Sequence, residues 1–125
     1  MKYIGIDYGS KRIGLAVGDD VNKIAFPLFV LANDKNFLGK LEDICKEKKI
    51  EAIVLGQSLD YKGVPNKIQD KISEFKSEIA KLTGLSVSYQ AEHFSSAEAS
   101  RSTNKVSLDS AAAALILQSY LDKTK

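Results

Sequence analysis

Residues 3–19, YIGIDYGSKRIGLAVGD, constrain the fold of this 125-residue chain more than any other stretch. Two runs rich in Ile, Leu and Val flank a Gly-Ser break at positions 9 and 10, a pattern that predicts a β-hairpin. Successive side chains of a strand point to opposite faces, so the large aliphatic residues of both runs share one face. These residues are Ile4, Ile6, Ile13, Leu15 and Val17. The other face consists mainly of glycine and carries one carboxylate, Asp7.

The nearly bare face of this hairpin has two interpretations. Glycine weakens a strand, and four glycines in one hairpin need a reason such as the close approach of another backbone or of a ligand. The alternative is a tightly twisted hairpin in which Asp7 caps its own turn. The hairpin considered alone favours this second interpretation.

The length and composition predict a single soluble domain, residues 1–125, in the cytoplasm. A chain of this size buries a core without disulfides, and the lone cysteine, Cys45, suits a reducing compartment. No apolar run approaches the roughly 20 residues of a membrane span, and the N-terminus lacks the layout of a signal peptide. The net charge of +2 neither demands nor excludes a nucleic-acid partner.

Strand and helix patterns alternate along the rest of the chain. Residues 24–31 predict a third strand at a sheet edge, because Pro27 cannot donate a ladder hydrogen bond. A helix capped by Asn33 and Asp34 should follow and run to about Lys48, with Cys45 as core filler on its apolar stripe. The later expectations are a strand over residues 52–55 ending at Gly56, a polar loop over 57–63, a helix over 68–82 that starts near Pro65 and stops at Gly84, a strand over 86–92, a short helix from Ser95 toward Arg101, and a last helix capped by Asn104 from Lys105 to about Leu121.

This order, βββ-α-β-α-β-α-α, predicts an α/β fold with a mixed sheet covered by helices. Short links between the first three strands favour an antiparallel meander. The unbroken apolar run AIVL at residues 52–55 is typical of a parallel strand buried on both faces.

Asp109 lies on an apolar stripe of the last helix. It shares this stripe with Ala113 and Ile116, and a carboxylate there is costly unless it is hydrogen-bonded, neutralised or bound to a cation. Four consecutive alanines, residues 111–114, make this helix thin. A thin helix can pack closely on the glycine-rich face that carries Asp7, which would bring the two carboxylates together.

Glu92 supplies a third carboxylate. It ends a strand, as Asp7 does, and the crevice beyond the carboxyl ends of strands is the usual site in open α/β sheets. Neighbouring carboxylates raise each other's pKa, and a hard divalent cation removes this conflict. Oxygen ligands suit Mg²⁺ or Mn²⁺, and paired ions of this kind support phosphodiester cleavage. For any one of these residues alone, an ordinary cap or salt-bridge partner is the simpler interpretation.

Four segments of this chain together resemble the YqgF (RuvX) family of small RNase H-like proteins. They are GIDYGSKRIGLAVGD, GQSLDYKG, the strand ending in Glu92, and LDSAAAALILQSYLD. The resemblance implies an RNase H-like fold, with a five-stranded mixed sheet made of an antiparallel three-strand meander and two parallel strands. It transfers the catalytic and metal-binding acidic triad onto Asp7, Glu92 and Asp109. It also implies a nuclease of the bacterial cytoplasm that hydrolyses structured nucleic acid with Mg²⁺ or Mn²⁺, in pre-16S rRNA processing or Holliday junction resolution.

This chain departs from the family pattern at three places. Ala91-Glu92-His93 stands where Asp-Glu-Arg is usual, and residues 57–60 lack the usual proline and asparagine. The basic segment before the last helix is reduced to residues 101–105. Fewer phosphate contacts would weaken nucleic-acid binding and make it less dependent on salt.

Lys11 and Arg12 directly follow the turn after Asp7 and are candidates for binding a phosphate beside the metal site. Lys62 and Lys105 are further candidates of the same kind. The alternative for each is a solvated surface charge.

Three hypotheses follow for the function. The first is a metal-dependent nuclease acting on nucleic acid as a monomer or homodimer. The second is a module that has kept the fold, lost catalysis and binds RNA or a protein. The third is a sugar-kinase or actin-like ATPase, which would need a second subdomain to enclose a nucleotide.

Overall fold

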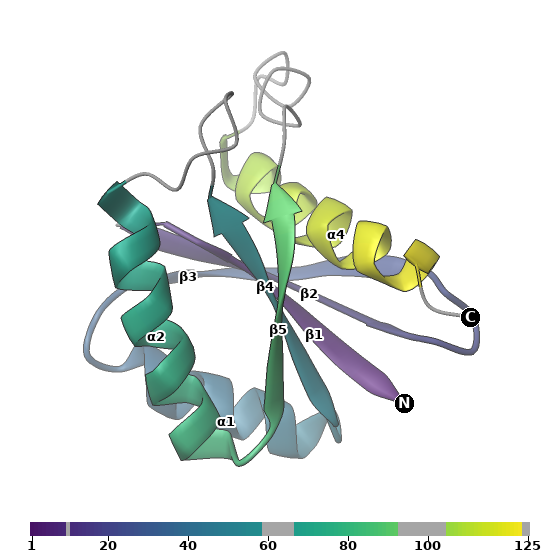
Figure 1. Ribbon diagram of the computed structural model, residues 1–125, viewed down its shortest axis with the longest axis horizontal. Helices are drawn as coiled ribbons and strands as arrows, with labels where there is room; N and C mark the ends of the chain where they lie inside the picture. Colours follow the sequence, from purple (N-terminus) through teal and green to yellow (C-terminus); the bar gives the residue numbers. More distant parts are fainter. Residues whose placement is uncertain (10, 59–66, 93–104, 124–125) are drawn as a thin grey trace.

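The computed structural model describes residues 1–9, 11–58, 67–92 and 105–123, with the side chains of 1–9, 11–56, 71–90 and 111–123 (Figure 1). Its elements in chain order are β1 (Lys2–Tyr8), β2 (Arg12–Asp19), β3 (Ala25–Ala32), α1 (Phe37–Glu47), β4 (Ala52–Ser58), α2 (Lys67–Thr83), β5 (Ser86–Glu92) and α4 (Lys105–Lys123). The described residues contain no helix with the length and hydropathy of a membrane span.

The five strands form one mixed sheet in the order β3-β2-β1-β4-β5. β1, β2 and β3 make an antiparallel meander, and β4 and β5 join the other side of β1 in parallel. The predicted hairpin, the meander and the five-stranded mixed sheet are therefore confirmed. The edge position predicted for β3 from Pro27 is also confirmed.

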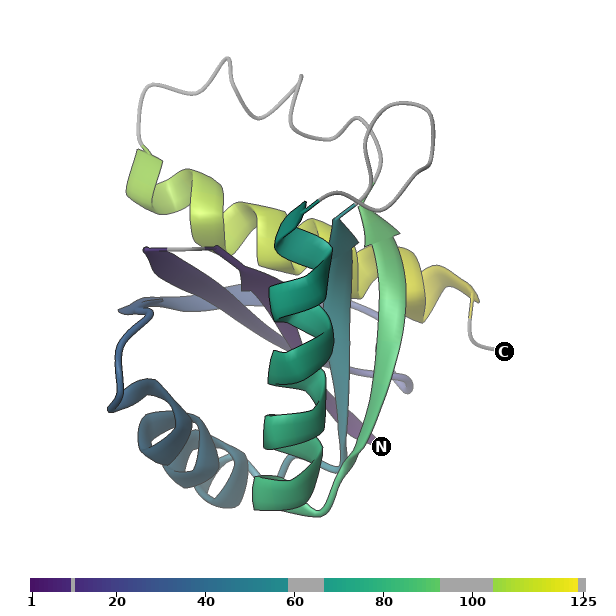
Figure 2. The same cartoon turned by 60° about the vertical axis from the view of Figure 1, so that its left-hand side comes forward.

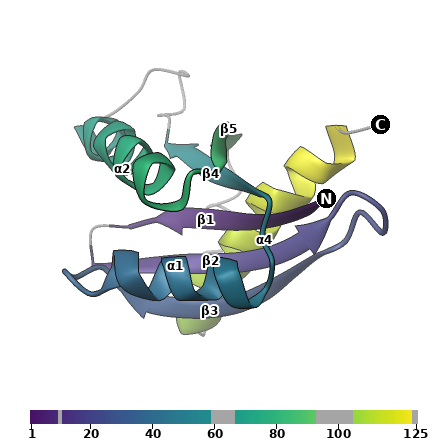
Figure 3. The same ribbon diagram turned by 90° about the horizontal axis from the view of Figure 1, so that it is seen from below.

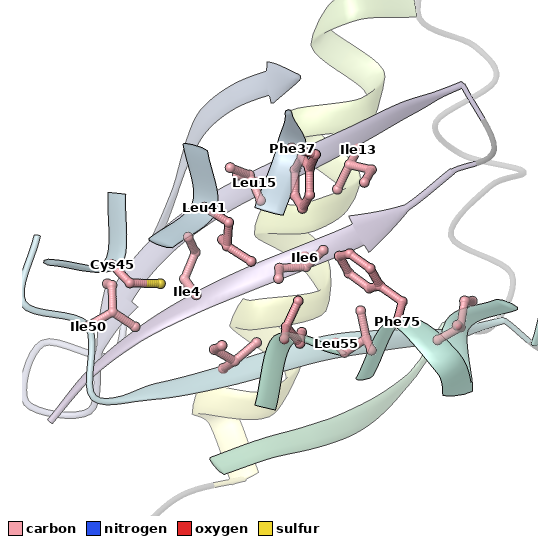
Figure 4. Packing of buried hydrophobic residues seen from close by; sticks show 13 residues of the cluster. Ile4, Ile6, Ile13, Leu15, Phe37, Leu41, Cys45, Ile50, Leu55 and Phe75 are labelled. Carbon is pink, nitrogen blue, oxygen red and sulfur yellow. The ribbon is translucent and has the colours of Figure 1, made fainter. Parts of the chain in front are cut away.

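Helices cover both faces of the sheet. Figure 3, a view from below, shows α1 in front of the strands and α4 behind them. The larger core lies on the α1 and α2 side, where Ile4 and Ile6 of β1 meet Phe37 and Phe75 (Figure 4). Its other fully buried members on the strands are Ile13, Leu15, Ile53 and Leu55. The alternation predicted for the hairpin thus sends its aliphatic face into this core.

Strand residues whose side chains point to the other face of the sheet build a second core under α4. Tyr3 of β1, Ala16 of β2 and Val54 of β4 pack there against Leu117 and Leu121. Consecutive residues of β4 are buried, and their side chains point to opposite faces. The strand is therefore covered on both faces, as its unbroken apolar run predicts. Figure 2 shows α4 lying across the sheet in this layer.

Three local predictions were wrong. Helix α1 begins at Phe37 with Asn36 at its N-cap, and not after Asn33 and Asp34. Strand β4 continues through Gly56 to Ser58, where a loop from residue 57 was expected. Leu82 of α2 is exposed rather than buried, although Ile72, Phe75 and Ile79 line the core at the predicted spacing.

The helix ends otherwise follow the sequence signals. Helix α2 stops at Thr83, and Gly84 then adopts a φ of +71°, a conformation that favours glycine. The predicted roles of Pro65 and Asn104 and the short helix from Ser95 lie outside the described residues.

Candidate active site

Helix α4 approaches β1 so closely that only glycine fits between them. A Cβ added at Gly5 would lie 2.7 Å from the Cβ of Leu117 and 3.0 Å from the backbone oxygen of Ala113. A Cβ added at Gly56 of β4 would lie 2.6 Å from Cδ1 of Ile116. The bare face of the hairpin is therefore a seat for the alanine-rich helix, as one of its two interpretations predicted.

The contacts of α4 run in the opposite direction to β1. The ring of Tyr3 lies 5.5 Å from that of Tyr120, while Gly5, two residues later, meets Leu117 and Ala113. Two more residues along β1 reach Asp7, an advance of about 6.6 Å. Four residues back along α4 from Ala113 lies position 109, a distance of about 6 Å. The backbones therefore bring the second turn of α4 toward the end of β1 that carries Asp7.

The carboxyl ends of strands β1, β4 and β5 lie at the same end of the sheet. Ile6 pairs with Leu55, and Gly56 with Gln90, so Asp7, Gly56 and Gln90 stand at one level. Alternation assigns position 92 to the same face as Gln90, whose side chain accepts a hydrogen bond from Lys123 of α4 at 3.3 Å. Glu92 is two strands away from Asp7 across the sheet and two residues further along, which separates their Cα atoms by roughly 12 Å.

The three predicted acidic residues thus belong to elements that meet at one end of the sheet. Asp7 is half-buried at the end of β1, Glu92 is the last residue of β5, and Asp109 lies in the second turn of α4. Among the described side chains, which include Asp7 but neither of the other two, no three His, Cys, Asp or Glu residues cluster as a metal site. These three predicted ligands are all carboxylates, and oxygen ligands are the kind that Mg²⁺ and Mn²⁺ prefer.

The turn after Asp7 is held by Asn33, a role that the sequence did not reveal. The Asn33 side-chain amide donates to the backbone oxygen of Gly9 at 2.8 Å, and its backbone N–H donates to the oxygen of Lys11 at 2.9 Å. The turn is also tight, because a Cβ at Gly9 would run into the backbone oxygen of Arg12. Both basic side chains, those of Lys11 and Arg12, are exposed beside this braced turn.

The remaining predicted contacts to nucleic acid are placed less fully. Lys105 is the first residue of α4, at the same end of the helix as Asp109. Lys62 lies outside the described residues, as does His93, which stands where the family usually has arginine. A groove of ≈ 320 Å³ adjoins the site at Tyr8 and Asn33, but its lining includes three carboxylates and only two lysines. This charge balance does not favour a polyanion.

Cys45 takes no part in the site. It is buried in the core beneath α1, and burial raises the pKa of its thiol to about 11. A thiol that stays protonated at neutral pH is a poor nucleophile, so its predicted role as core filler is confirmed.

Comparisons with known proteins agree with this architecture. The model of the family described as "RuvX: Holliday junction resolvase" matches residues 1–123. A protein of Anaplasma marginale named "Putative pre-16S rRNA nuclease" is 34% identical, with 99% of this chain and 86% of the relative covered. A protein of the same name from Agathobacter rectalis is 32% identical, with 98% and 95% covered.

Solved structures with little sequence identity share the fold. Thermus thermophilus RuvC in complex with a Holliday junction substrate superposes with a TM-score of 0.62 at 15% identity, covering 97% of this chain and 93% of that one. The Holliday junction resolvase of fowlpox virus superposes with a TM-score of 0.60 at 16% identity, covering 99% and 100%. These likenesses confirm the RNase H-like fold. From the family model and the relatives, this chain is a member of the RuvX (YqgF) family.

Proposed function

We propose that this protein is a divalent-metal-dependent nuclease that hydrolyses phosphodiester bonds in structured nucleic acid. The relatives are named for pre-16S rRNA, and the matched family is described as a Holliday junction resolvase. The substrate classes to test are therefore precursor rRNA and branched DNA. Asp7, Glu92 and Asp109 are the proposed catalytic residues and metal ligands.

One observation supports this proposal most directly. The glycine positions of β1 and β4 let α4 lie directly on the sheet, and α4 runs opposite to β1. The second turn of the helix consequently lies toward the same end of the sheet as the carboxyl ends of β1 and β5. A spacing of roughly 12 Å between the Cα atoms of Asp7 and Glu92 suits side chains that reach toward shared ions rather than toward each other.

The three carboxylates would hold Mg²⁺ or Mn²⁺, since all their donor atoms are hard oxygens. When bound, such ions supply an activated water for attack at phosphorus and neutralise the departing oxygen. The overall reaction consumes one water: a P–O bond to the attacking oxygen forms, and the P–O bond to the leaving sugar oxygen breaks.

The protein's own cations would position the substrate. Lys11 lies in the turn after Asp7 that Asn33 fixes through two hydrogen bonds, and Arg12 follows as the first residue of β2. A braced loop loses less conformational freedom on binding than a mobile one, so its cations hold a phosphate more effectively. Arg12 can engage phosphate oxygens in bidentate fashion, and Lys11 acts as a point charge.

The test is cleavage of branched DNA and of precursor rRNA by the purified chain with Mg²⁺, Mn²⁺ or EDTA. Asp7→Asn should remove cleavage while the protein stays folded by circular dichroism. Asp43→Asn, an exposed carboxylate on α1, is the matched control and should cleave as the wild type does. Metal-independent cleavage, or full activity in Asp7→Asn, would overturn the proposal. Glu92→Gln and Asp109→Asn test the other two ligands in the same assay.

A second candidate is a binding module that has lost catalysis. The sequence Ala91-Glu92 at the end of β5, where the family usually has two acidic residues, favours it. Thermal unfolding with increasing Mn²⁺ discriminates the two, because a ligand that binds the folded state raises the melting temperature. A melting temperature that Mn²⁺ leaves unchanged, together with retained RNA binding, would support the binding module.

A further inference from the structure

The groove of ≈ 320 Å³ beside the end of β1 is lined by three aromatic residues. The ring of Phe75 on α2 lies 4.9 Å from that of Tyr8 and 5.6 Å from that of Phe37. Phe37 and Phe75 belong to the buried core on the α1 and α2 side of the sheet (Figure 4). Tyr8 is only half-buried. Tyr8 therefore presents the aromatic surface of this groove that a ligand can reach.

The rim of the groove carries both hydrogen-bond donors and acceptors. Glu74 and Glu78 are exposed one turn apart on α2, and Lys71 precedes them on the same helix. Asn33 lines the groove from the loop before α1. Its amide nitrogen donates to the backbone oxygen of Gly9, and its amide oxygen remains an acceptor. Because carboxylates outnumber lysines in this lining, the groove suits an uncharged polar ring better than a phosphate.

An unpaired nucleobase has the size and chemistry that this groove accommodates. The volume is at the lower end of the roughly 300–1,000 Å³ found for small-molecule pockets. Bases that are recognised outside a double helix stack on aromatic side chains and form hydrogen bonds along their Watson–Crick edges. Carboxylates accept hydrogen bonds from exocyclic amino groups such as that of cytosine, which uracil lacks. The rim of the groove therefore favours a base that carries an amino group.

The groove adjoins the turn that we assign to phosphate binding. Asn33 belongs to both, because it lines the groove and bonds the backbone oxygens of Gly9 and Lys11. Tyr8 directly follows Asp7, and strand alternation points these two side chains to opposite faces of β1. A base in the groove would therefore belong to a nucleotide beside the cleaved bond. It would not belong to the nucleotide whose phosphate the ions bind.

We propose that this groove binds one unpaired nucleobase with an exocyclic amino group, next to the phosphate that the protein cleaves. Tyr8 stacks on the base, and Glu74 or Glu78 accepts a hydrogen bond from its amino group. This inference rests on the proposed function, because it takes nucleic acid as the substrate. It adds a preference for substrates that offer an unpaired base, since extracting a paired base from a helix costs free energy.

The test compares labelled RNA duplexes that differ only in a single-nucleotide bulge. The bulge holds cytosine, uracil or an abasic residue. The phosphates of the three probes are identical, so the ratios of their affinities report the base alone. Fluorescence anisotropy in EDTA measures binding without metal-dependent cleavage. The wild type should bind the cytosine probe at least fivefold more tightly than the abasic probe, the lower end for a base stacked on an aromatic side chain. It should also prefer cytosine to uracil.

Two variants test different parts of the groove. Tyr8→Leu removes the ring, keeps an apolar side chain and should lose the preference for a base over the abasic residue. Glu74→Ala/Glu78→Ala changes only exposed residues and should lose the preference for cytosine over uracil. Asp43→Ala/Glu47→Ala on α1 is the matched control, because both residues are exposed, four positions apart and acidic. This control should keep both preferences of the wild type.

Equal affinities of the wild type for the cytosine and abasic probes would overturn the inference. Preferences that survive in both groove variants would also overturn it, because the base would then be bound elsewhere. None of these measurements depends on cleavage. A chain that fails the nuclease assay but shows both preferences, and loses them in the variants, supports the groove as a base site. Metal-dependent cleavage without any preference for a base overturns the groove assignment alone and leaves the proposed function intact.

Discussion

Leu117 of α4 lies over Gly5 of β1 with no room for a side chain between them, since a Cβ at Gly5 would be 2.7 Å from the Cβ of Leu117. The same helix rests on Gly56 of β4 through Ile116. At Gly18 of β2, an added Cβ would lie 2.7 Å from the backbone oxygen of Ile24 and 3.1 Å from Cδ1 of Leu121, so the chain entering β3 restricts this position more than the helix does. Gly5 therefore sets the distance between the helix and the sheet, because its two nearest contacts on α4 are a Cβ atom and a backbone oxygen. That distance also decides how near Asp109 comes to the strand ends.

Replacing Gly5 with alanine should force α4 away from the sheet. Both atoms that a Cβ would meet, Leu117 Cβ and Ala113 O, belong to or lie next to the backbone, so neither can turn aside. We expect a loss of about 1–3 kcal/mol in the free energy of unfolding, as for other overpacked cores. Urea denaturation measures this loss. Cleavage should also fall at temperatures where the variant is fully folded, because the helix that carries Asp109 has moved.

Gly39 provides the control for this substitution. It lies on the exposed side of α1, and a Cβ there would meet no atom within 4 Å. Gly39→Ala should raise the free energy of unfolding by about 0.5–1 kcal/mol, because alanine favours the helix and restricts the unfolded chain. Equal effects of the two substitutions would show that close packing against α4 does not determine the requirement for glycine at position 5.

The sequence predicted the faces of the sheet well, because alternation is a local property. The positions of Ile4, Ile6 and Asp7 follow directly from the two-residue period of a strand. The seat for α4 was predicted from complementary shapes, a row of glycines and a run of alanines, and the structure confirms it. The side-chain positions of Glu92 and Asp109 remain predictions.

The wrong predictions depend on contacts between distant parts of the chain. Asn33 carries an ordinary capping signal, but its amide instead bonds Gly9, 24 residues away. Gly56 looked like a strand end, yet it stays in β4 because β5 pairs with it and Ile116 of α4 packs on it. Neither partner can be identified from the neighbouring sequence.

Asn33→Ala should loosen the turn after Asp7. The oxygen of Gly9 would lose a part-buried hydrogen bond, which costs about 1 kcal/mol in the free energy of unfolding. Nucleic-acid affinity should fall as well, because Lys11 and Arg12 would no longer be held in place. Asn22→Ala is the control, since Asn22 makes an exposed 3.4 Å side-chain hydrogen bond to Asp19 in the turn between β2 and β3. If both variants bind equally, Asn33 does not position the basic turn.

Burial of Cys45 should make its reactivity and its contribution to stability depend on pH. With a pKa of about 11 instead of 9.0, the folded protein has about a hundredfold less thiolate near neutral pH than the unfolded chain. Iodoacetamide should therefore label Cys45 only through unfolding. Between pH 9 and 11 the unfolded thiol ionises while the folded one keeps its proton, so the free energy of unfolding falls as pH rises. Urea denaturation should show a shallower pH slope in this window for Cys45→Ala.

Lys11 and Arg12 should contribute to binding through released counterions. Each phosphate contact adds about 0.7–0.9 to the slope of log affinity against log salt concentration. The double variant Lys11→Gln/Arg12→Gln should therefore bind more weakly and reduce the slope by about 1–2. Fluorescence anisotropy of labelled branched DNA or RNA, measured over a range of KCl concentrations, gives this slope.

A variant with the same change in net charge separates a local contact from a general attraction. Lys2 at the start of β1 and Lys46 in the last turn of α1 are exposed, and Lys2 is at the opposite end of β1 from Asp7. Lys2→Gln/Lys46→Gln lowers the net charge by the same two units but should leave the slope close to that of the wild type. Equal slopes for the two double variants would mean that nucleic acid responds only to net charge. The braced turn beside Asp7 would then not be its binding site.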